Sequence, residues 1–222
     1  MLTSDHGGYL GDHWLGEKEL FYDAAARIPM IVVDPDASAD ETRRTQDDRL
    51  FESIDLIPTF MDLAGCEDIP NHWLEGRSLV PLLWGEMDVA WRDAAFCECD
   101  YALRHAHNTS AMGPQDYRSF MIRTDRWKFI LNEGFRLQLF DMKNDPGELV
   151  DLGEDPAHEE VRREMSDRIF EWMRKGKLRT SLSNEEIASR TGMAKERGYL
   201  LRHLVKKKKG PAKCLKIHVD WR

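Results

Sequence analysis

The chain has 222 residues, of which 41% are hydrophobic and 32% are charged, and its net charge is −8. This length suffices for one or one and a half domains, and the composition is that of a soluble globular protein. No apolar run approaches the roughly 20 residues that a membrane-spanning helix needs, which argues against an integral membrane protein. The four cysteines are too few for a disulfide scaffold.

The first part of the chain predicts short alternating elements. Residues 1–2 are typical of the end of a strand, and residues 3–8 of the loop after it. Residues 17–26 predict a helix that ends before Pro29, because the residue preceding a proline avoids the helical region. The apolar run 30–33 is typical of a buried strand.

A second helix is predicted from its cap and its stop. Asp55 suits the cap position, Pro58 is tolerated in the first turn, and Gly65 is a natural end. Four apolar residues at helical spacing predict its buried side: Ile57, Phe60, Met61 and Ala64. Residues 94–99 then predict a strand.

The second half of the chain predicts an antiparallel meander and one long helix. Residues 117–124, 126–131 and 135–140 have strand length and apolar texture, with turn-forming residues between them. Asp155 as cap and Pro156 at the first position predict the start of the helix. Its apolar stripe consists of Val161, Met165, Ile169, Trp172 and Met173.

The loop after the first strand carries a possible cation site. Asp5 and His6 are adjacent there, ahead of Gly7 and Gly8. A carboxylate and an imidazole on one tight loop can bind the same divalent cation, and glycines permit the close backbone approach that this requires. Taken alone, the pattern favours a structural turn, because Asp and His are common in loops.

The residues around this loop extend the pattern. Thr3–Lys18, followed by Tyr22 and the Arg27-Ile28-Pro29 run, resembles the sulfatase branch of the alkaline phosphatase superfamily, in particular bacterial phosphonate monoester hydrolases and related arylsulfatases. Further segments resemble that family in the same order: Ser53–Thr59, Leu63-Ala64-Gly65, Gly76–Leu79, Pro81-Leu82-Leu83, Trp127–Ile130, Leu139–Asp141 and Asp145–Glu148. The resemblance covers most of residues 1–175 and is specific as a set.

The resemblance implies roles for three residues, and a fourth residue is considered beside them. Asp5 and His6 match two ligands of one divalent cation, with Ca, Mn, Mg and Zn all open. Lys18 matches the family lysine that contacts the charged oxygens of the substrate and stabilises the leaving group. His13 is assigned to substrate binding, with capping of the loop as the alternative. Without the family pattern, Lys18 is an ordinary solvated lysine at the start of a helix.

The resemblance also implies a hydrolase of sulfate, phosphonate or phosphate esters, both monoesters and diesters, acting on a small anionic substrate. Enzymes of this family use a formylglycine nucleophile made from the Cys or Ser of a C/S-x-P-x-R segment, which this sequence lacks. We therefore expect the chain to be the C-terminal part of such an enzyme, beginning in the middle of the fold, and to be inactive alone.

The expected fold is α/β: the C-terminal portion of an alkaline-phosphatase-like mixed sheet with flanking helices, plus a small antiparallel subdomain. The expected boundaries place the α/β part at 1–113. They place the subdomain of antiparallel sheet plus helix at 114–175, and a basic extension at 176–222.

The remaining cysteines and histidines give weaker signals. Cys97 and Cys99 would share one face of a strand as free thiols or, alternatively, as a soft-metal pair, although no second pair stands at zinc-site spacing. His105 and His107 lie two apart in a polar loop and either face solvent or bind a metal.

The end of the chain is strongly basic. Residues 202–222 carry eight Lys or Arg against one Asp, most densely at 206–209. This run favours a solvated tail, or an arm against an acidic neighbouring subunit, over nucleic-acid binding. We expect a homo-oligomer formed through the C-terminal region, without nucleic-acid or membrane partners. No signal-peptide pattern opens the sequence, so we expect a cytoplasmic location.

Two other functions are compatible with parts of the sequence. A non-catalytic remnant would act as a binding or oligomerisation module, with the basic arm as its contact. Relatives of phosphoglycerate mutases and nucleotide pyrophosphatases also use Asp-His pairs, but the strand texture after residue 117 argues against them. In-frame coding sequence upstream of Met1 that contains a C/S-x-P-x-R segment would favour the enzyme over the remnant.

Overall fold

A computed structural model of the chain describes residues 1–66, 73–86, 88–101, 117–176 and 186. The chain divides into two compact units, residues 1–181 and 182–222, and every element described below belongs to the first. Within the described residues, no helix combines the length and the apolar character needed to cross a membrane.

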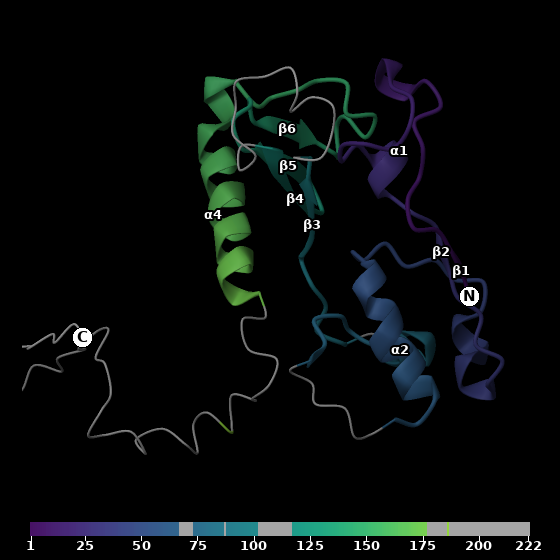
Figure 1. The fold of residues 1–222 in the computed structure, drawn as a ribbon. Helices are drawn as coiled ribbons and strands as arrows, with labels where there is room; N and C mark the ends of the chain where they lie inside the picture. Colours follow the sequence, from purple (N-terminus) through teal and green to yellow (C-terminus); the bar gives the residue numbers. More distant parts are fainter. Residues whose placement is uncertain (67–72, 87, 102–116, 177–185, 187–222) are drawn as a thin grey trace, which may run out of the picture. The chain divides into compact units, whose positions relative to one another are not determined.

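A four-stranded antiparallel sheet is the largest element (Figure 1). Its strands follow the chain in order: β3 (Ala94–Asp100), β4 (Arg118–Thr124), β5 (Trp127–Asn132) and β6 (Gln138–Asp141). In register, Met121 of β4 stands opposite Cys97 of β3 and Ile130 of β5. The predicted strand at 94–99 and the predicted meander are both confirmed.

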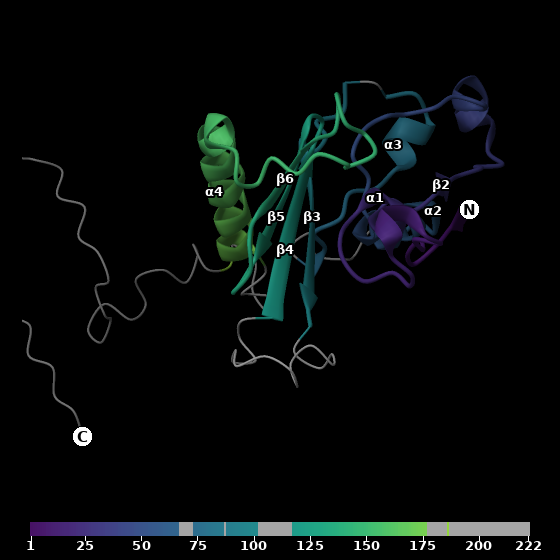
Figure 2. The same cartoon turned by 90° about the horizontal axis from the view of Figure 1, so that it is seen from above.

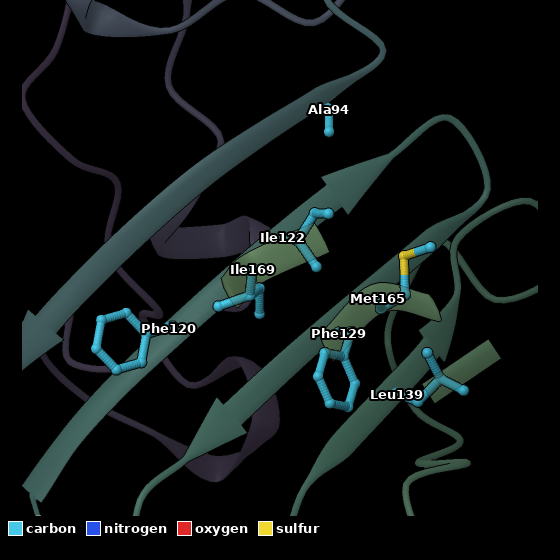
Figure 3. Close-up of a cluster of buried hydrophobic side chains, with 7 residues drawn as sticks. All are labelled: Ala94, Phe120, Ile122, Phe129, Leu139, Met165 and Ile169. Atoms are coloured by element: carbon cyan, nitrogen blue, oxygen red, sulfur yellow. The ribbon is translucent and has the colours of Figure 1, made fainter. Parts of the chain in front are cut away.

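One face of this sheet packs against α4 (Glu159–Lys175) (Figures 1 and 2). The Asp155 side chain accepts a hydrogen bond from the Ala157 backbone N–H, which confirms the predicted cap. Successive side chains of a strand point to opposite faces, so alternate residues of β4 and β5 meet the helix. The buried core, shown in Figure 3, comprises Ala94, Phe120, Ile122, Phe129, Leu139, Met165 and Ile169.

The predicted apolar stripe of α4 is confirmed for four of its five members. Met165 and Ile169 are buried, and Val161 and Trp172 pack at the edge of the core. Met173 is 36% exposed and lies outside the stripe.

The other face of the sheet carries a second apolar cluster. Phe21 packs there with buried residues of the strands and of the turn after β6: Met121, Ile130, Phe140 and Met142. Phe21 lies two positions before the start of α1 (Asp23–Ala26), so this cluster brings the N-terminal loops onto the sheet.

The N-terminal strands form a separate two-stranded ribbon, in which β1 (Leu2–Thr3) pairs antiparallel with β2 (Met30–Ile31). Both strands are where the sequence predicts them. The expected burial of residues 30–33 is wrong, because Ile31 is 57% exposed and Val33 is 69% exposed. An apolar run identifies a strand but does not identify what covers it.

The helix predicted at residues 17–26 is also wrong over most of its length, since only Asp23–Ala26 is helical. Glu17 and Leu20 have φ angles of 60° and 83°, which a right-handed helix does not allow. The loop conformation sends Phe21 into the sheet cluster. Tertiary packing therefore overrides the local helical pattern.

The helix after Asp55 is present as α2 (Leu56–Leu63), and Gly65 ends it with a φ of 67°. Its expected apolar face is exposed: Ile57 and Phe60 are 58% and 52% exposed. The side chain of Asp55 does not cap α2, which corrects the sequence-based assignment. It is fully buried and binds elsewhere, as described below.

A short helix, α3 (Val80–Leu83), follows the Gly76–Leu79 segment. A Cβ atom at Gly76 would lie 1.9 Å from the Ile54 carbonyl oxygen, so only glycine fits this contact. The segment therefore packs closely against the start of α2.

The strand β3 lies on the N-terminal side of the boundary expected at residue 113, yet it pairs along its whole length with β4. The antiparallel sheet thus includes residues from both sides of that boundary. The division of the chain at 113 and 175 stays a prediction.

Candidate functional site

The loop that follows β1 holds His6 in one defined state. Its Nδ1 lies 2.6 Å from the Gly7 carbonyl oxygen, and the Ser4 hydroxyl donates to the His6 carbonyl at 2.6 Å. Because a carbonyl oxygen only accepts, Nδ1 carries the proton. The lone pair of Nε2 is therefore available to a cation or a donor.

Gly7 fixes this loop to α1. Its N–H donates to the Ala25 carbonyl at 2.8 Å. A Cβ atom at this position would lie 2.0 Å from the Ala24 carbonyl oxygen. Only glycine permits this approach of two backbones, which sets the position of the adjacent Asp5 and His6.

Lys18 lies against these two residues. Its Nζ is 2.5 Å from His6 Nε2, and the Asp5 carboxylate is 3.4 Å from the same nitrogen. The pKa of Asp5 is lowered, chiefly by a hydrogen bond from its own backbone N–H, with the Lys18 charge acting in the same direction. Asp5 is therefore an ionised carboxylate at neutral pH.

The loop that carries Lys18 is held at both ends. On one side the Tyr9 N–H donates to the Glu17 carbonyl at 3.0 Å. On the other side the Leu20 N–H donates to the Tyr101 hydroxyl at 3.1 Å. Left-handed φ angles at Glu17 and Leu20 are unfavourable for residues with a side chain, and they persist only where the surroundings enforce them.

A buried cluster of charges anchors the same segment to the sheet. Lys128 of β5 is 1% exposed, and its Nζ donates to the Phe21 carbonyl at 2.9 Å, to Glu148 at 2.6 Å, and to Asp23. Glu148 also accepts a hydrogen bond from the Asp23 backbone N–H at 2.6 Å. Asp23 is the first residue of α1, so this cluster positions the helix whose Ala25 carbonyl accepts the hydrogen bond from Gly7.

A cavity of about 340 Å³ opens beside Asp5, His6 and Lys18. Cys97 and Cys99 line it from β3. Its apolar lining includes Leu20, Phe21, Ile28, Phe51, Phe96 and Met121. A lining that combines charged groups, here including Glu52 and Glu98, with apolar side chains is the usual composition of a small-molecule site.

His13 lies apart from this cavity, whose lining does not include it. Its ring stacks on Tyr22 with centroids 4.0 Å apart and an interplanar angle of 17°. Tyr22 in turn accepts a hydrogen bond from Gln138 of β6 at 3.1 Å. The structure thus brings Asp5, His6 and Lys18 together and places His13 elsewhere, so its role in substrate binding stays a prediction.

Asp5 and His6 provide an ionised oxygen and an unprotonated nitrogen, which are suitable ligands for a divalent cation. Among the described residues, no group of three or more His, Cys, Asp or Glu side chains is placed to hold a metal ion. The pair offers two ligands at most, and a complete coordination sphere would require other groups.

A second charged network lies beneath α2. Arg92 donates to both oxygens of the buried Asp55 and lies 3.0 Å from Glu52. Burial raises the pKa of Glu52, while the Phe96 N–H and Arg92 act in the opposite direction. Asp55 also accepts the N–H of Arg77 at 2.8 Å. Asp55, which was expected to cap α2, thus links the segments that carry Arg77 and Arg92.

Sequence patterns gave no role in the site to three residues that hold it: Tyr101, Lys128 and Glu148. Lys128 and Glu148 do fall within two of the family-like segments. Lys128 is also unusual as a lysine among the apolar residues of β5. Cys66, Cys97 and Cys99 are free cysteines. We expected buried or half-buried thiols, but Cys66 and Cys97 are exposed and only Cys99 is half-buried. His105, His107 and Cys214 lie outside the described residues.

Comparison with known proteins identifies relatives of most of this chain. The sequence model of the family described as N-sulphoglucosamine sulphohydrolase, C-terminal, matches residues 11–175. The multifunctional alkaline phosphatase superfamily protein PehA of Trinickia caryophylli is 29% identical over 175 residues, which are 78% of this chain and 33% of that protein. The N-acetylglucosamine-6-O-sulfatase of Bacteroides thetaiotaomicron is 32% identical over 158 residues, 68% of this chain and 26% of that protein.

The fold has solved counterparts as well. The phosphonate monoester hydrolase of Agrobacterium radiobacter aligns with a TM-score of 0.69 at 30% identity, covering 78% of this chain and 34% of that one. This chain therefore agrees with the family in its fold as well as in its sequence. The chain spans about a third of the length of the relatives that it matches.

Proposed function

We propose that this chain, which belongs to the sulfatase family of the alkaline phosphatase superfamily and matches its C-terminal part, supplies the cation-binding loop and the charge-stabilising lysine of an ester hydrolase. Proteins of this family are hydrolases that use a divalent metal. The observation that carries the proposal is the convergence of Asp5, His6 and Lys18 at the mouth of one cavity.

The substrates proposed are sulfate, phosphonate or phosphate esters. When such an ester is cleaved, negative charge grows on the non-bridging oxygens and on the leaving oxygen. Asp5 and His6 would hold a divalent cation, which polarises these oxygens as a Lewis acid. The Lys18 ammonium, now donating to His6, is placed to transfer that hydrogen bond to a bound anion.

The chain's own groups set the protonation states that this role needs. The hydrogen bond from Nδ1 to Gly7 directs the free lone pair of His6 towards Lys18 and Asp5. The lowered pKa of Asp5 keeps its carboxylate charged. Asp5 therefore does not have to lose a proton when a cation binds near neutral pH.

No C/S-x-P-x-R segment occurs in this sequence, so the proposed half-site has no family-type nucleophile of its own. We expect the 222-residue chain to show no turnover of aryl sulfates or phosphonate monoesters. Turnover should appear when the chain is fused behind the region that precedes the matched segment in the Agrobacterium radiobacter phosphonate monoester hydrolase.

The test compares three versions of this fusion. The unaltered fusion should hydrolyse a phosphonate monoester or an aryl sulfate. Lys18→Ala should lower kcat by about 100-fold or more, the usual effect of removing one transition-state donor, without loss of bound metal. Lys143→Ala changes an exposed lysine outside the site and should have no effect. A folded, metal-loaded fusion without turnover, or equal loss of metal and rate in Lys18→Ala, would contradict the assignment.

A further inference from the structure

Three side chains that contain sulfur meet on one face of the sheet. Cys97 and Cys99 are two positions apart on β3, so their side chains point to the same face. Met121 of β4 stands directly opposite Cys97 in the register. All three residues line the cavity described above, so they border the same space.

The register brings these three side chains within reach of one ion. Residues directly opposite in an antiparallel pair have Cβ atoms about 4.5–5.5 Å apart, which is the relation of Cys97 to Met121. Cys99 stands opposite Ser119, so Met121 is its diagonal neighbour, at a separation that a long side chain bridges. Cys99 also packs against the apolar cluster that contains Met121. A single ion can therefore contact two thiols and one thioether.

The spacing of the two thiols suits a bridging ion better than a disulfide. Residues two apart on a strand are separated by about 6.6 Å along it, whereas a disulfide needs Cβ atoms about 3.5–4.5 Å apart. Two metal–sulfur bonds of about 2.3 Å each span a longer gap than one S–S bond of about 2.0 Å. Both cysteines are free in this structure.

The three sulfur donors also select the kind of metal. Thiolate and thioether sulfurs are soft ligands that suit Cu(I), whereas Mg²⁺ and Ca²⁺ prefer oxygen. Structural zinc sites take four ligands, and within the described parts of the chain no third His, Cys, Asp or Glu joins this pair. Cu(I) accepts fewer ligands than zinc does, so two thiolates and a thioether are sufficient for it.

The position of the three residues allows an ion to enter and then shields it. Cys97 is exposed and Cys99 is half-buried, so the thiols can be reached from solvent. Met121 is buried in the cluster with Phe21 and Ile130, so the inner side of the site is apolar. Each thiol gives up one proton to the buffer when Cu(I) binds, and the oxidation state of the copper does not change.

We propose that Cys97, Cys99 and Met121 form a binding site for the soft monovalent ion Cu(I) in the wall of this cavity. Its ligands are distinct from Asp5 and His6, so the inference does not depend on the proposed function.

The test uses the reduced 222-residue chain without oxygen, because air oxidises Cu(I). The starting variant is Cys66→Ser/Cys214→Ser, in which Cys97 and Cys99 are the remaining thiols. Cu(I) is supplied as its coloured complex with bicinchoninate, and transfer to the protein is followed by the loss of that colour. One Cu(I) per chain should be taken up, and X-ray absorption at the copper edge should show three sulfur neighbours.

Single changes in this starting variant test each ligand. Cys97→Ser and Cys99→Ser should each weaken Cu(I) binding by about 100-fold or more, because a hydroxyl replaces a soft ligand. Met121→Leu keeps the side-chain volume and should weaken binding about ten-fold, with two sulfur neighbours left. Met142→Leu is the matched control, because Met142 is buried in the same cluster but does not line the cavity. It should change neither the affinity nor the coordination, and circular dichroism checks that every variant is folded.

Three results would overturn the inference. Failure of the starting variant to take Cu(I) from bicinchoninate would show that the site does not exist. Unchanged affinity in Cys97→Ser or Cys99→Ser would show that the thiols are not the ligands. Equal affinity and an equal number of sulfur neighbours in Met121→Leu would exclude the thioether.

Discussion

Replacement of Lys128 by methionine tests how the site is attached to the sheet. The variant keeps an unbranched side chain of similar length and removes the ammonium that contacts Glu148, Asp23 and the Phe21 carbonyl. The side chains of Lys128 and Glu148 are only 1% and 2% exposed, so a carboxylate would be left buried without its partner. Such losses cost about 3–5 kcal/mol.

This magnitude is large enough to measure directly. Each kcal/mol shifts the Tm of a unit of 150–250 residues by about 2–4 °C, so Lys128→Met should melt about 6–20 °C below the wild type. Denaturant unfolding followed by circular dichroism gives the free energy difference independently. Cation binding should weaken in parallel, because α1 supports the Gly7 contact.

Two further variants define the mechanism. Lys143→Met removes an exposed pair with Asp125 and should change stability by no more than about 1 kcal/mol. Adding Glu148→Gln to Lys128→Met should cost less than the sum of the single changes, because the unpaired charge is removed. A loss below about 1 kcal/mol in Lys128→Met, or full additivity in the double variant, would refute the reasoning.

Three other outcomes are expected. Gly7→Ala places a Cβ atom 2.0 Å from the Ala24 carbonyl oxygen, so it should cost about 1–3 kcal/mol of stability and displace the cation loop. At Gly8 the nearest atom to an added Cβ is 3.8 Å away, so Gly8→Ala should have little effect. Denaturant unfolding compares the two variants. Arg126 holds the pKa of Asp141 at about 2 rather than 3.8. The charged carboxylate therefore stabilises the fold above pH 3.8, and this stability is lost as the pH falls towards 2. In Asp141→Asn the unfolding free energy should fall less steeply between these two pH values. Phe60 is 52% exposed, so Phe60→Ala should change stability within about 0.5 kcal/mol, against about 3–5 kcal/mol for Phe129→Ala in the core. Equal losses of stability in Gly7→Ala and Gly8→Ala, or in Phe60→Ala and Phe129→Ala, would contradict the contacts described. An unchanged pH dependence in Asp141→Asn would contradict the third.

The sheet and its long helix could be predicted from the sequence because their signals are local. Apolar segments of strand length, separated by turn residues, identified β4 and β5, and the Asp155 cap with Pro156 identified the start of α4. The segment 17–26 could not be predicted in this way. Its left-handed residues and the placement of Phe21 are set by contacts with the distant sheet.

The same distinction separates the parts of the site. Asp5, His6 and Lys18 lie within one short stretch, so their pattern is visible in the sequence. Lys128 is 105 positions from Asp23, and Tyr101 is 81 positions from Leu20, so no local pattern connects them. Likewise, an apolar stripe on α2 does not reveal whether another segment covers it, and here Ile57 and Phe60 are exposed.

The central claim is that Asp5 and His6 form a cation-binding loop in this chain. Titration with Mn²⁺, followed by electron paramagnetic resonance of the free ion, measures this directly on the 222-residue protein. One site is expected, weakened about ten-fold or more by Asp5→Ala and by His6→Ala, and unchanged by Asp12→Ala, which removes an exposed carboxylate nearby. Equal Mn²⁺ affinity in the wild type, Asp5→Ala and His6→Ala would contradict the account.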